Sequence, residues 1–273
     1  MPKGKYMAKA ELLFVATTSG IITLSNPGGI GRWLKAGHSL TTHAITCVWC
    51  NPSDPTHVLC GDGSQLWQSH DGAQTWHPLA GPACRTLIAS RTAPTRIMGH
   101  DGQHAWLSDD AGASWRQLGV AMRIGMAGDV VWYDQQLSRD GGQTWHPHAP
   151  QCVGISSDSH TMLTTTDDVT VWSLANQPIP APAVACQSWA VCGGQPWTCL
   201  GVHAGTVWRY QDAWQMQTQI TAHIVYASIY HPDHVWAASH AGAVWLSSDR
   251  GQTWQDVRQG LLPITALVNA RLL

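Results

Sequence analysis

The octapeptide Ser247-Ser248-Asp249-Arg250-Gly251-Gln252-Thr253-Trp254 recurs, with small changes, at three earlier places in the chain. The other copies span residues 69–76, 108–115 and 138–145, and each keeps serine first, aspartate third, a hydroxyl residue seventh and tryptophan last. The fifth residue is glycine in three copies and Ala73 in the remaining one. A pattern that returns along a chain predicts copies of one supersecondary unit.

Each octapeptide predicts a turn that caps itself. Aspartate and hydroxyl side chains can bond the turn's own backbone N–H groups, glycine supplies a position with φ > 0, and tryptophan folds over the hairpin. Because one role repeats at equivalent places, we interpret the aspartates as structural rather than catalytic. The structural set is Ser69, Asp71, Trp76, Ser108, Asp110, Gly112, Trp115, Ser138, Asp140, Gly142, Trp145, Ser247, Asp249, Gly251 and Trp254.

These octapeptides resemble the Asp box, S-x-D-x-G-x-[ST]-W, of the bacterial neuraminidase (BNR) repeat family of β-propellers. The chain is similar in this respect to sialidase-type propellers and to photosystem II assembly factors. The resemblance implies an all-β fold of four-stranded antiparallel blades. It implies little about function, because in that family the boxes are structural hairpins of hydrolases, receptors and assembly factors alike.

Strands and turns at a spacing of 8–12 residues predict a seven-bladed β-propeller. The second blade shows the pattern, with strands expected over 45–50, 57–60, 65–68 and 75–79. The first blade has three expected strands, over 11–16, 21–24 and 32–34, and lacks an innermost one. The expected strand over 264–272 can supply it, so this blade would be shared between the two ends of the chain. We expect an N-terminal tail over 1–9 and a single propeller domain over 10–273. The register of blade four stays open, with Trp132 in its second or third strand.

The low charge content of the chain argues against some classes of binding partner. Charged residues make up 12% of the 273 residues and the formal net charge is -2, so the chain lacks the electrostatic footprint of nucleic-acid or membrane binding. The apolar run 12–16 is too short for a signal-peptide core, which predicts a cytoplasmic protein with reduced cysteines. Cys47 and Cys50 should face opposite sides of a strand, which argues against a metal site there. We expect a monomer without a cofactor.

The boxes define one rim of the ring, and we call the opposite rim the top. The resemblance implies that ligands bind at the top, over the central channel. Counting back from the following proline gives His43, Arg85 and His223 equivalent positions, and hydrophobic register adds Arg123 and Gln187. Thr265 and either Gln151 or Cys152 are expected nearby. The expected top turns contribute Asp62, His100, Asp101, Asp129, Asp167, Asp168, His203 and His240.

These residues would surround the mouth of the central channel at the top rim, and three interpretations of them stay open. Arginine, histidine and glutamine together can hold a carboxylate or another small anion through charge-assisted hydrogen bonds. Several histidines with an aspartate can bind a divalent metal. The third interpretation is that these are ordinary turn residues and solvated channel linings.

The family's enzymes give partial matches only. Its sialidases use three arginines with a tyrosine–glutamate pair, whereas Glu11 is the single glutamate of this chain. Xyloglucan-cleaving relatives resemble two facing propellers, of which one ring supplies half. Streptogramin lyases, also seven-bladed, use histidine and magnesium at the channel mouth. Photosystem II assembly factors are single rings with an arginine-rich patch, but the eleven arginines here are scattered.

We therefore expect a non-catalytic binding or scaffold propeller that recognises a protein or a small polar or anionic ligand at the top face. The alternative is a lyase-like or glycosidase-like enzyme using the same face. Histidine would then act as general base and Arg85 or Arg123 would hold an anionic substrate.

Overall fold

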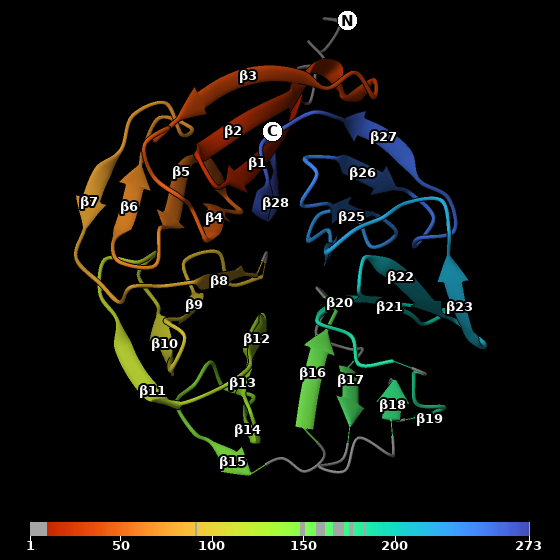
Figure 1. Ribbon diagram of the computed structural model, residues 1–273. Helices are drawn as coiled ribbons and strands as arrows, with labels where there is room; N and C mark the ends of the chain where they lie inside the picture. Colours follow the sequence, from red (N-terminus) through yellow and green to blue (C-terminus); the bar gives the residue numbers. More distant parts are fainter. Residues whose placement is uncertain are drawn as a thin grey trace, which may run out of the picture.

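A computed structural model describes residues 10–90, 92–147, 151–156, 162–165, 172–174, 177–182 and 184–272. Its strands form four-stranded antiparallel sheets that stand as blades around a common centre (Figure 1). The only helical element in these ranges is a short 3-10 turn, Pro27–Gly29. The expected all-β propeller is confirmed.

The closing sheet joins the two ends of the chain. Its order is β28 (Ile264–Leu272), β1 (Ala10–Thr17), β2 (Gly20–Asn26) and β3 (Leu34–Ser39). Strand β1 pairs with β28 from Ala10↔Leu272 to Thr17↔Ile264. The predicted shared blade is therefore confirmed, and the last strand lies innermost.

The remaining sheets follow in chain order, each from its innermost strand outward. They are β4 (Cys47–Asn51), β5 (Asp54–Gly61), β6 (Leu66–Ser69) and β7 (His77–Leu79); β8 (Thr86–Ala89), β9 (Ile97–His100), β10 (His104–Ser108) and β11 (Arg116–Val120); β12 (Ile124–Ala127), β13 (Val130–Tyr133), β14 (Gln136–Ser138) and β15 (His146–Pro147); β16 (Gln151–Ile155), β17 (Met162–Thr165), β18 (Trp172–Leu174) and β19 (Gln177–Ile179); β20 (Ser188–Cys192), β21 (Thr198–His203), β22 (Thr206–Tyr210) and β23 (Trp214–Gln217); β24 (Ile224–Ala227), β25 (Val235–Ala238), β26 (Val244–Ser247) and β27 (Gln255–Arg258).

The expectation of seven packed blades needs a correction. Six sheets are described with nearly all of their side chains, and these are the blades whose packing can be followed. The sheet β16–β19 is defined by backbone pairing, because most of its side chains and connections lie outside the described residues. Six blades, rather than seven, are thus described in full.

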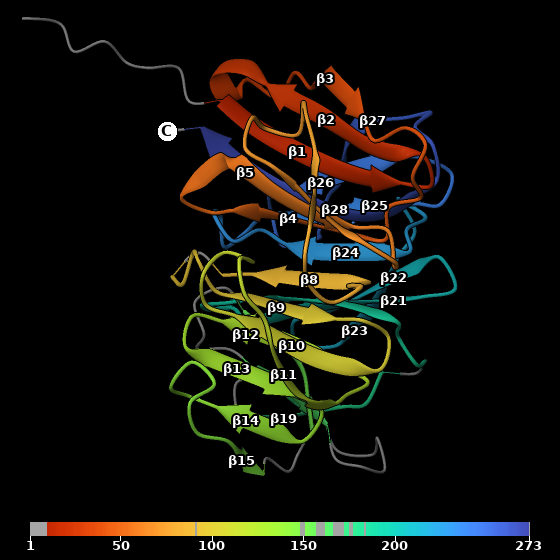
Figure 2. The ribbon, with the colours of Figure 1, turned by 90° about the vertical axis from the view of Figure 1, so that its left-hand side faces the viewer.

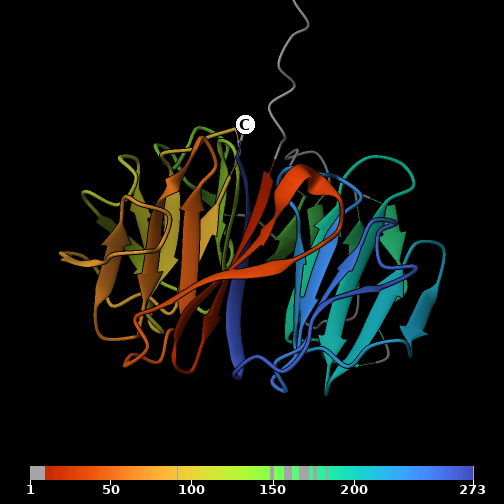
Figure 3. The same cartoon turned by 90° about the horizontal axis from the view of Figure 1, so that it is seen from above.

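The turns divide cleanly between two rims (Figures 2 and 3). In each blade that carries a box, the fourth box residue donates its backbone N–H to the connection between the first two strands or, for Gly72, to Thr56 near the start of the second strand β5. The four bonds are Gly72 to Thr56, Ala111 to Thr95, Gly141 to Asp129 and Arg250 to Asp233, at 2.7–2.9 Å. This places both kinds of turn on one rim, the box rim, and the turns between second and third strands on the top rim.

Two sequence-based positions change, and one open alternative is decided. Asp129 lies on the box rim, where it pairs with Arg96 at 2.7 Å, and not in a top turn. Trp132 belongs to the second strand of its blade, β13. The apolar and aromatic residues of the last blade predict an inner strand over 226–230, but β24 spans Ile224–Ala227, because residues 228–234 form the connection to β25.

The core lies between blades rather than inside any one of them. Leu13 and Val15 of the closing blade pack against Trp236 and Val244 of the last blade. Alternate residues of the same strand face the other way, so Phe14 and Ala16 pack with Val48 of the next blade. Burial of such side chains contributes roughly 1.5–3 kcal/mol each, so every blade depends on both neighbours.

The boxes are the self-capped turns that the sequence predicts. Ser247 Oγ accepts the Gly251 N–H at 2.7 Å and donates to Asp249 Oδ1 at 2.8 Å, while Asp249 Oδ2 accepts the Thr253 hydroxyl at 2.6 Å. Equivalent bonds recur in the other boxes. These bonds, led by that from Thr75, hold the pKa of Asp71 well below its usual range. The structural role assigned to the boxes fits this geometry.

Candidate functional site

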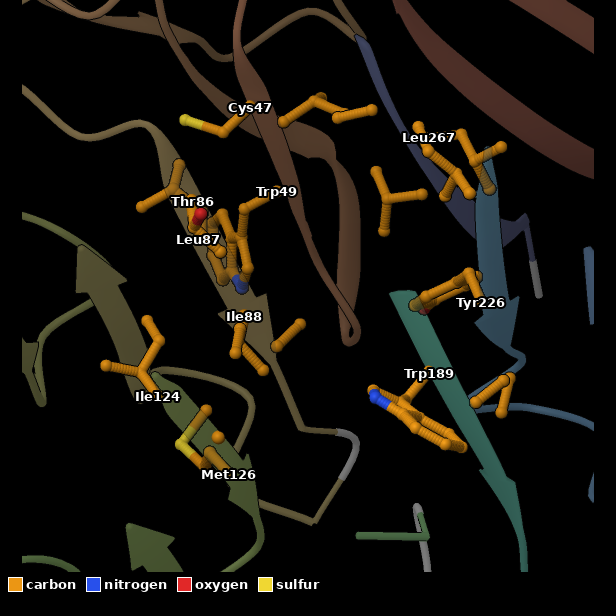
Figure 4. Close-up of a pocket in the computed structure, with 18 of the residues that line it drawn as sticks. Cys47, Trp49, Thr86, Leu87, Ile88, Ile124, Met126, Trp189, Tyr226 and Leu267 are labelled. Atoms are coloured by element: carbon orange, nitrogen blue, oxygen red, sulfur yellow. The ribbon is translucent and has the colours of Figure 1, made fainter. Parts of the chain in front are cut away.

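The innermost strands enclose a cavity of about 380 Å³ at the centre of the ring. Figure 4 shows side chains from several blades around it: Trp49 of β4, Ile88 of β8, Met126 of β12, Trp189 of β20, Tyr226 of β24 and Leu267 of β28. The volume lies within the roughly 300–1,000 Å³ typical of small-molecule sites. A central cavity of this kind is the first candidate site.

The wall of this cavity is mostly apolar, because inner strands of neighbouring blades pack through Val, Leu, Ile and Trp side chains. Its polar side chains include Thr46, Arg85, Thr86 and Thr265, which stand at or just before the beginning of inner strands. Those strands begin at the top rim. Ser90, which follows β8, and the Tyr226 hydroxyl add polar groups nearer the box rim, so the wall is mostly apolar and its charged group, Arg85, lies at the upper end.

Arg85 is the charged group of this upper end. It is exposed and yet lines the cavity, so the cavity reaches the top surface beside it. Its backbone N–H donates to His100 O at 2.7 Å, which fixes the residue at the rim. A Cβ built on Gly102 would lie 3.4 Å from Arg85 Nε, so the absence of a side chain there leaves room for the guanidinium. Among the described residues, Arg85 forms no ion pair.

His43 does not occupy the position that the sequence analysis gave it. The backbone N–H groups of Thr46, Arg85 and His223 each donate to the end of a second strand, at 2.8, 2.7 and 2.8 Å, which makes these three residues equivalent. His43 lies three residues earlier, packs edge-on against Trp67 at 4.7 Å and is not part of the cavity wall. Thr46 therefore replaces His43 at the mouth.

Three of the expected mouth residues lie on the same rim but outside the cavity wall: Arg123, Gln187 and His223. Arg123 and Gln187 are exposed and precede β12 and β20. Asp134, which the sequence analysis missed, accepts the N–H of Arg123 at 2.9 Å. His223 stacks on His240 at 3.4 Å, and its Nε2 lies 2.8 Å from Ile264 O. Burial, followed by the neighbouring His240, lowers the pKa of His223. The neutral imidazole is therefore favoured, and it holds the start of β28 through its contact with Ile264 O.

Two top-turn aspartates are structural. Asp62 Oδ1 accepts the N–H groups of Ser64 and Gln65, and its Oδ2 accepts Trp67 Nε1–H at 3.1 Å. Asp101 holds Trp106 in the same way at 2.9 Å. Burial alone would raise the pKa of Asp62, but these hydrogen bonds outweigh it and lower the pKa to about 2. Both carboxylates are thus committed to their own turns.

The remaining top-rim histidines tie connections together. His100 Nε2 lies 2.8 Å from Ala121 O, and His203 Nδ1 lies 2.7 Å from Ala185 O. His240 is exposed against His223. Asp167 and Asp168 lie outside the described residues, as do the side chains of Gln151 and Cys152.

The described residues bring together no group of three histidine, cysteine or acidic side chains suited to a metal ion. Cys47 and Cys50 face different blades, as predicted, and burial raises the pKa of Cys47 to about 12. Within the described ranges, no helix is long and apolar enough to cross a membrane. The arrangement can hold an apolar group with an anionic end.

Comparison with known proteins identifies the repeat and the fold. A family model, the BNR/Asp-box repeat, matches residues 136–147, and no curated protein matches. The structure of YCF48 bound to D1 peptide aligns with a TM-score of 0.53 and 16% identity over 94% of this chain and 87% of that one.

Two further structures show the same architecture. An ancestral GH74 enzyme has a TM-score of 0.58 and 11% identity over 90% of this chain, which spans only 44% of the enzyme. The structure of a nidogen/laminin complex gives 0.57 and 8% identity over 95% of this chain and 98% of the matched one. At such identities the likeness shows the fold alone.

Proposed function

Because the chain is an Asp-box β-propeller, we propose that it is a binding protein whose top mouth takes a ligand with an apolar body and a carboxylate end. The observation that carries this proposal is the apolar cavity that opens beside Arg85. The apolar body would fill the space between Trp49, Trp189 and Tyr226, and the carboxylate would meet the guanidinium at the rim. YCF48, of similar fold, has been solved with a bound peptide, which supports a protein partner as one source of such a group.

Catalysis has less support at this mouth. The aspartates Asp62 and Asp101 are bonded within their turns, and His223 clamps a loop. The proposal therefore assigns recognition to the mouth and no reaction. His43→Ala should leave binding within about twofold of wild type, because that side chain packs on Trp67 outside the cavity.

Tryptophan fluorescence can follow binding, because Trp49, Trp132 and Trp189 line the cavity. We expect octanoate to change the emission and hexanoate, which is two CH₂ groups shorter, to bind about fifteenfold more weakly, since each buried CH₂ contributes about 0.8 kcal/mol. Arg85→Gln should weaken octanoate binding about two- to fivefold, the modest effect of an exposed charge, and leave 1-octanol binding unaffected. Arg139→Gln, an exposed arginine of the box rim, is the matched control.

The source of the carboxylate is tested separately. An apolar hexapeptide with a free carboxyl terminus should bind more tightly than its amide if a protein end is the natural ligand. Equal binding of the acid and amide peptides, together with the weaker octanoate binding expected of Arg85→Gln, would favour a small molecule as the natural ligand. If octanoate and hexanoate bind equally well, and if Arg85→Gln does not weaken octanoate binding, the top mouth is refuted as the binding site.

A further inference from the structure

A second pocket lies on the opposite, box rim, where the closing blade meets the last blade. Its volume is about 460 Å³, again within the roughly 300–1,000 Å³ of small-molecule sites. Its walls come from the start of β1, the connection between β2 and β3, the connection between β24 and β25, and strands β26 and β27. It is thus separate from the central cavity.

Three polar side chains stand in one row across the closing sheet and line this pocket. Glu11 pairs in register with Asn26 on one side and with Arg271 on the other. Residues directly opposite one another in a sheet point to the same face, with Cβ atoms about 4.5–5.5 Å apart. Leu13 shares the face of Glu11 and packs against the last blade, so the row faces that blade.

Glu11 is held in place from two sides. Its Oε2 accepts Asn26 Nδ2–H at 3.0 Å, and its Oε1 lies 3.4 Å from His231 Nε2 of the facing blade. His231 in turn packs against His234, with ring centroids 4.4 Å apart. The single glutamate of the chain is therefore a fixed acceptor at the pocket wall.

Arg271 lies directly across from Glu11 on the neighbouring strand β28. Its Nε is buried and has no hydrogen-bond partner within the described part of the chain. Arg271 also makes no ion pair there with Glu11, although the two are cross-strand neighbours. A buried charged donor without a partner costs free energy, and a ligand acceptor would remove that cost.

The connection that replaces the Asp box in this blade leaves the pocket open. Gly28, Gly29 and Gly31 have φ values of 71, 65 and 79°, and a Cβ built on Gly31 would meet nothing within 4 Å. Trp33 follows and packs edge-on against Trp236 at 5.2 Å, which gives the pocket a rigid apolar side. The glycines thus leave a partly apolar space beside the row formed by Glu11, Asn26 and Arg271.

The charges of the wall select the ligand. A simple anion would pair with Arg271 but also face Glu11 and Asp256, and a simple cation would pair with Glu11 but face Arg271. A molecule that carries both charges a few ångströms apart satisfies Glu11 and Arg271 together. We propose that this pocket binds a zwitterionic α-amino acid, with its carboxylate on Arg271, its ammonium on Glu11 and its side chain toward Trp33.

The test begins with wild-type protein at pH 8. The proteinogenic amino acids are screened by thermal shift, and isothermal titration follows for the strongest with its des-amino acid and its decarboxylated amine. We expect the amino acid to bind at least tenfold more tightly than either analogue. Equal binding of the des-amino acid, or no stabilisation by any amino acid, would overturn the proposal.

Two variants test which side chain binds each charged group of the amino acid. Arg271→Gln should weaken the amino acid at least tenfold without weakening the amine. Glu11→Gln should weaken the amino acid similarly but strengthen the des-amino acid, because repulsion of its carboxylate is removed. Arg258→Gln, an exposed arginine of β27, is the matched control and should change nothing. If Arg258→Gln weakens amino-acid binding as much as Arg271→Gln does, the assignment of the charges is contradicted. If a variant fails to fold, the comparison of the amino acid with its two analogues on wild-type protein still decides the proposal.

Discussion

Replacement of the first box serine by alanine should destabilise each box by a similar amount. Ser69, Ser108, Ser138 and Ser247 are at most 1% exposed. Each accepts the N–H of the fifth box residue, at 2.9, 2.8, 2.7 and 2.7 Å. The substitution deletes that acceptor and leaves the buried N–H without a partner.

The magnitude follows from this geometry. An unsatisfied buried donor costs about 1–3 kcal/mol. The lost bond from the serine hydroxyl to the box aspartate adds less, because none of the four box aspartates is fully buried. We therefore expect each variant to lose about 1–3 kcal/mol, with the four values agreeing within about 1 kcal/mol. For a chain near this size, 1 kcal/mol corresponds to a shift in Tm of about 2–4 °C.

Differential scanning calorimetry on the four single variants measures this prediction. Ser248→Ala is the matched control, because Ser248 is the exposed neighbour of Ser247 in the same box. Its Tm should change by less than about 2 °C, as is usual for a surface substitution of under 0.5 kcal/mol. If any box serine behaves like Ser248, or if one variant is far more damaging than the rest, the interpretation of the boxes as equivalent structural turns is refuted.

Three further predictions concern stability. Because hydrogen bonds lower the pKa of Asp62 to about 2, below an unfolded value near 3.9, its contribution is present above about pH 4 and is lost as the pH falls toward 2; Asp62→Asn should flatten acid unfolding in this window, measured by circular dichroism. Gly142→Ala should cost at least about 1–2 kcal/mol in urea unfolding, because φ is 83° and the new Cβ would lie 2.7 Å from Leu107, whereas Ala73→Gly, at the equivalent box position, should have a small effect. Deletion of residues 264–273 removes β28 and should abolish cooperative unfolding, and a truncated ring that keeps the wild-type Tm would contradict closure by that strand.

The parts of this fold that local chemistry determines were predictable. The boxes contain their own hydrogen-bond partners, so their role follows from eight consecutive residues. The lone C-terminal strand was also predictable, because strands 11–16 and 21–24 left an inner position empty. The strand boundaries around Trp132 and in β24 were not, since pairing partners decide them.

The mouth was predicted less well, for a geometric reason. Counting from proline assumed equal turns, but β4 and β5 are joined by two residues, whereas β24 and β25 are joined by seven. The shorter turn moved the equivalent position from His43 to Thr46. The pocket on the box rim had a weak sequence signal in the single Glu11 and the glycines at 28, 29 and 31. Only the register with Arg271 reveals its chemistry.

The most direct test of the proposed binding function is a crystal structure with 8-bromooctanoate, whose bromine can be located by anomalous scattering. Binding at the top mouth predicts a bromine peak in the central cavity near Trp49 and Trp189, with the carboxylate at Arg85 on the top rim. Bromine bound elsewhere, or an empty cavity at a ligand concentration that saturates the fluorescence change, would contradict it.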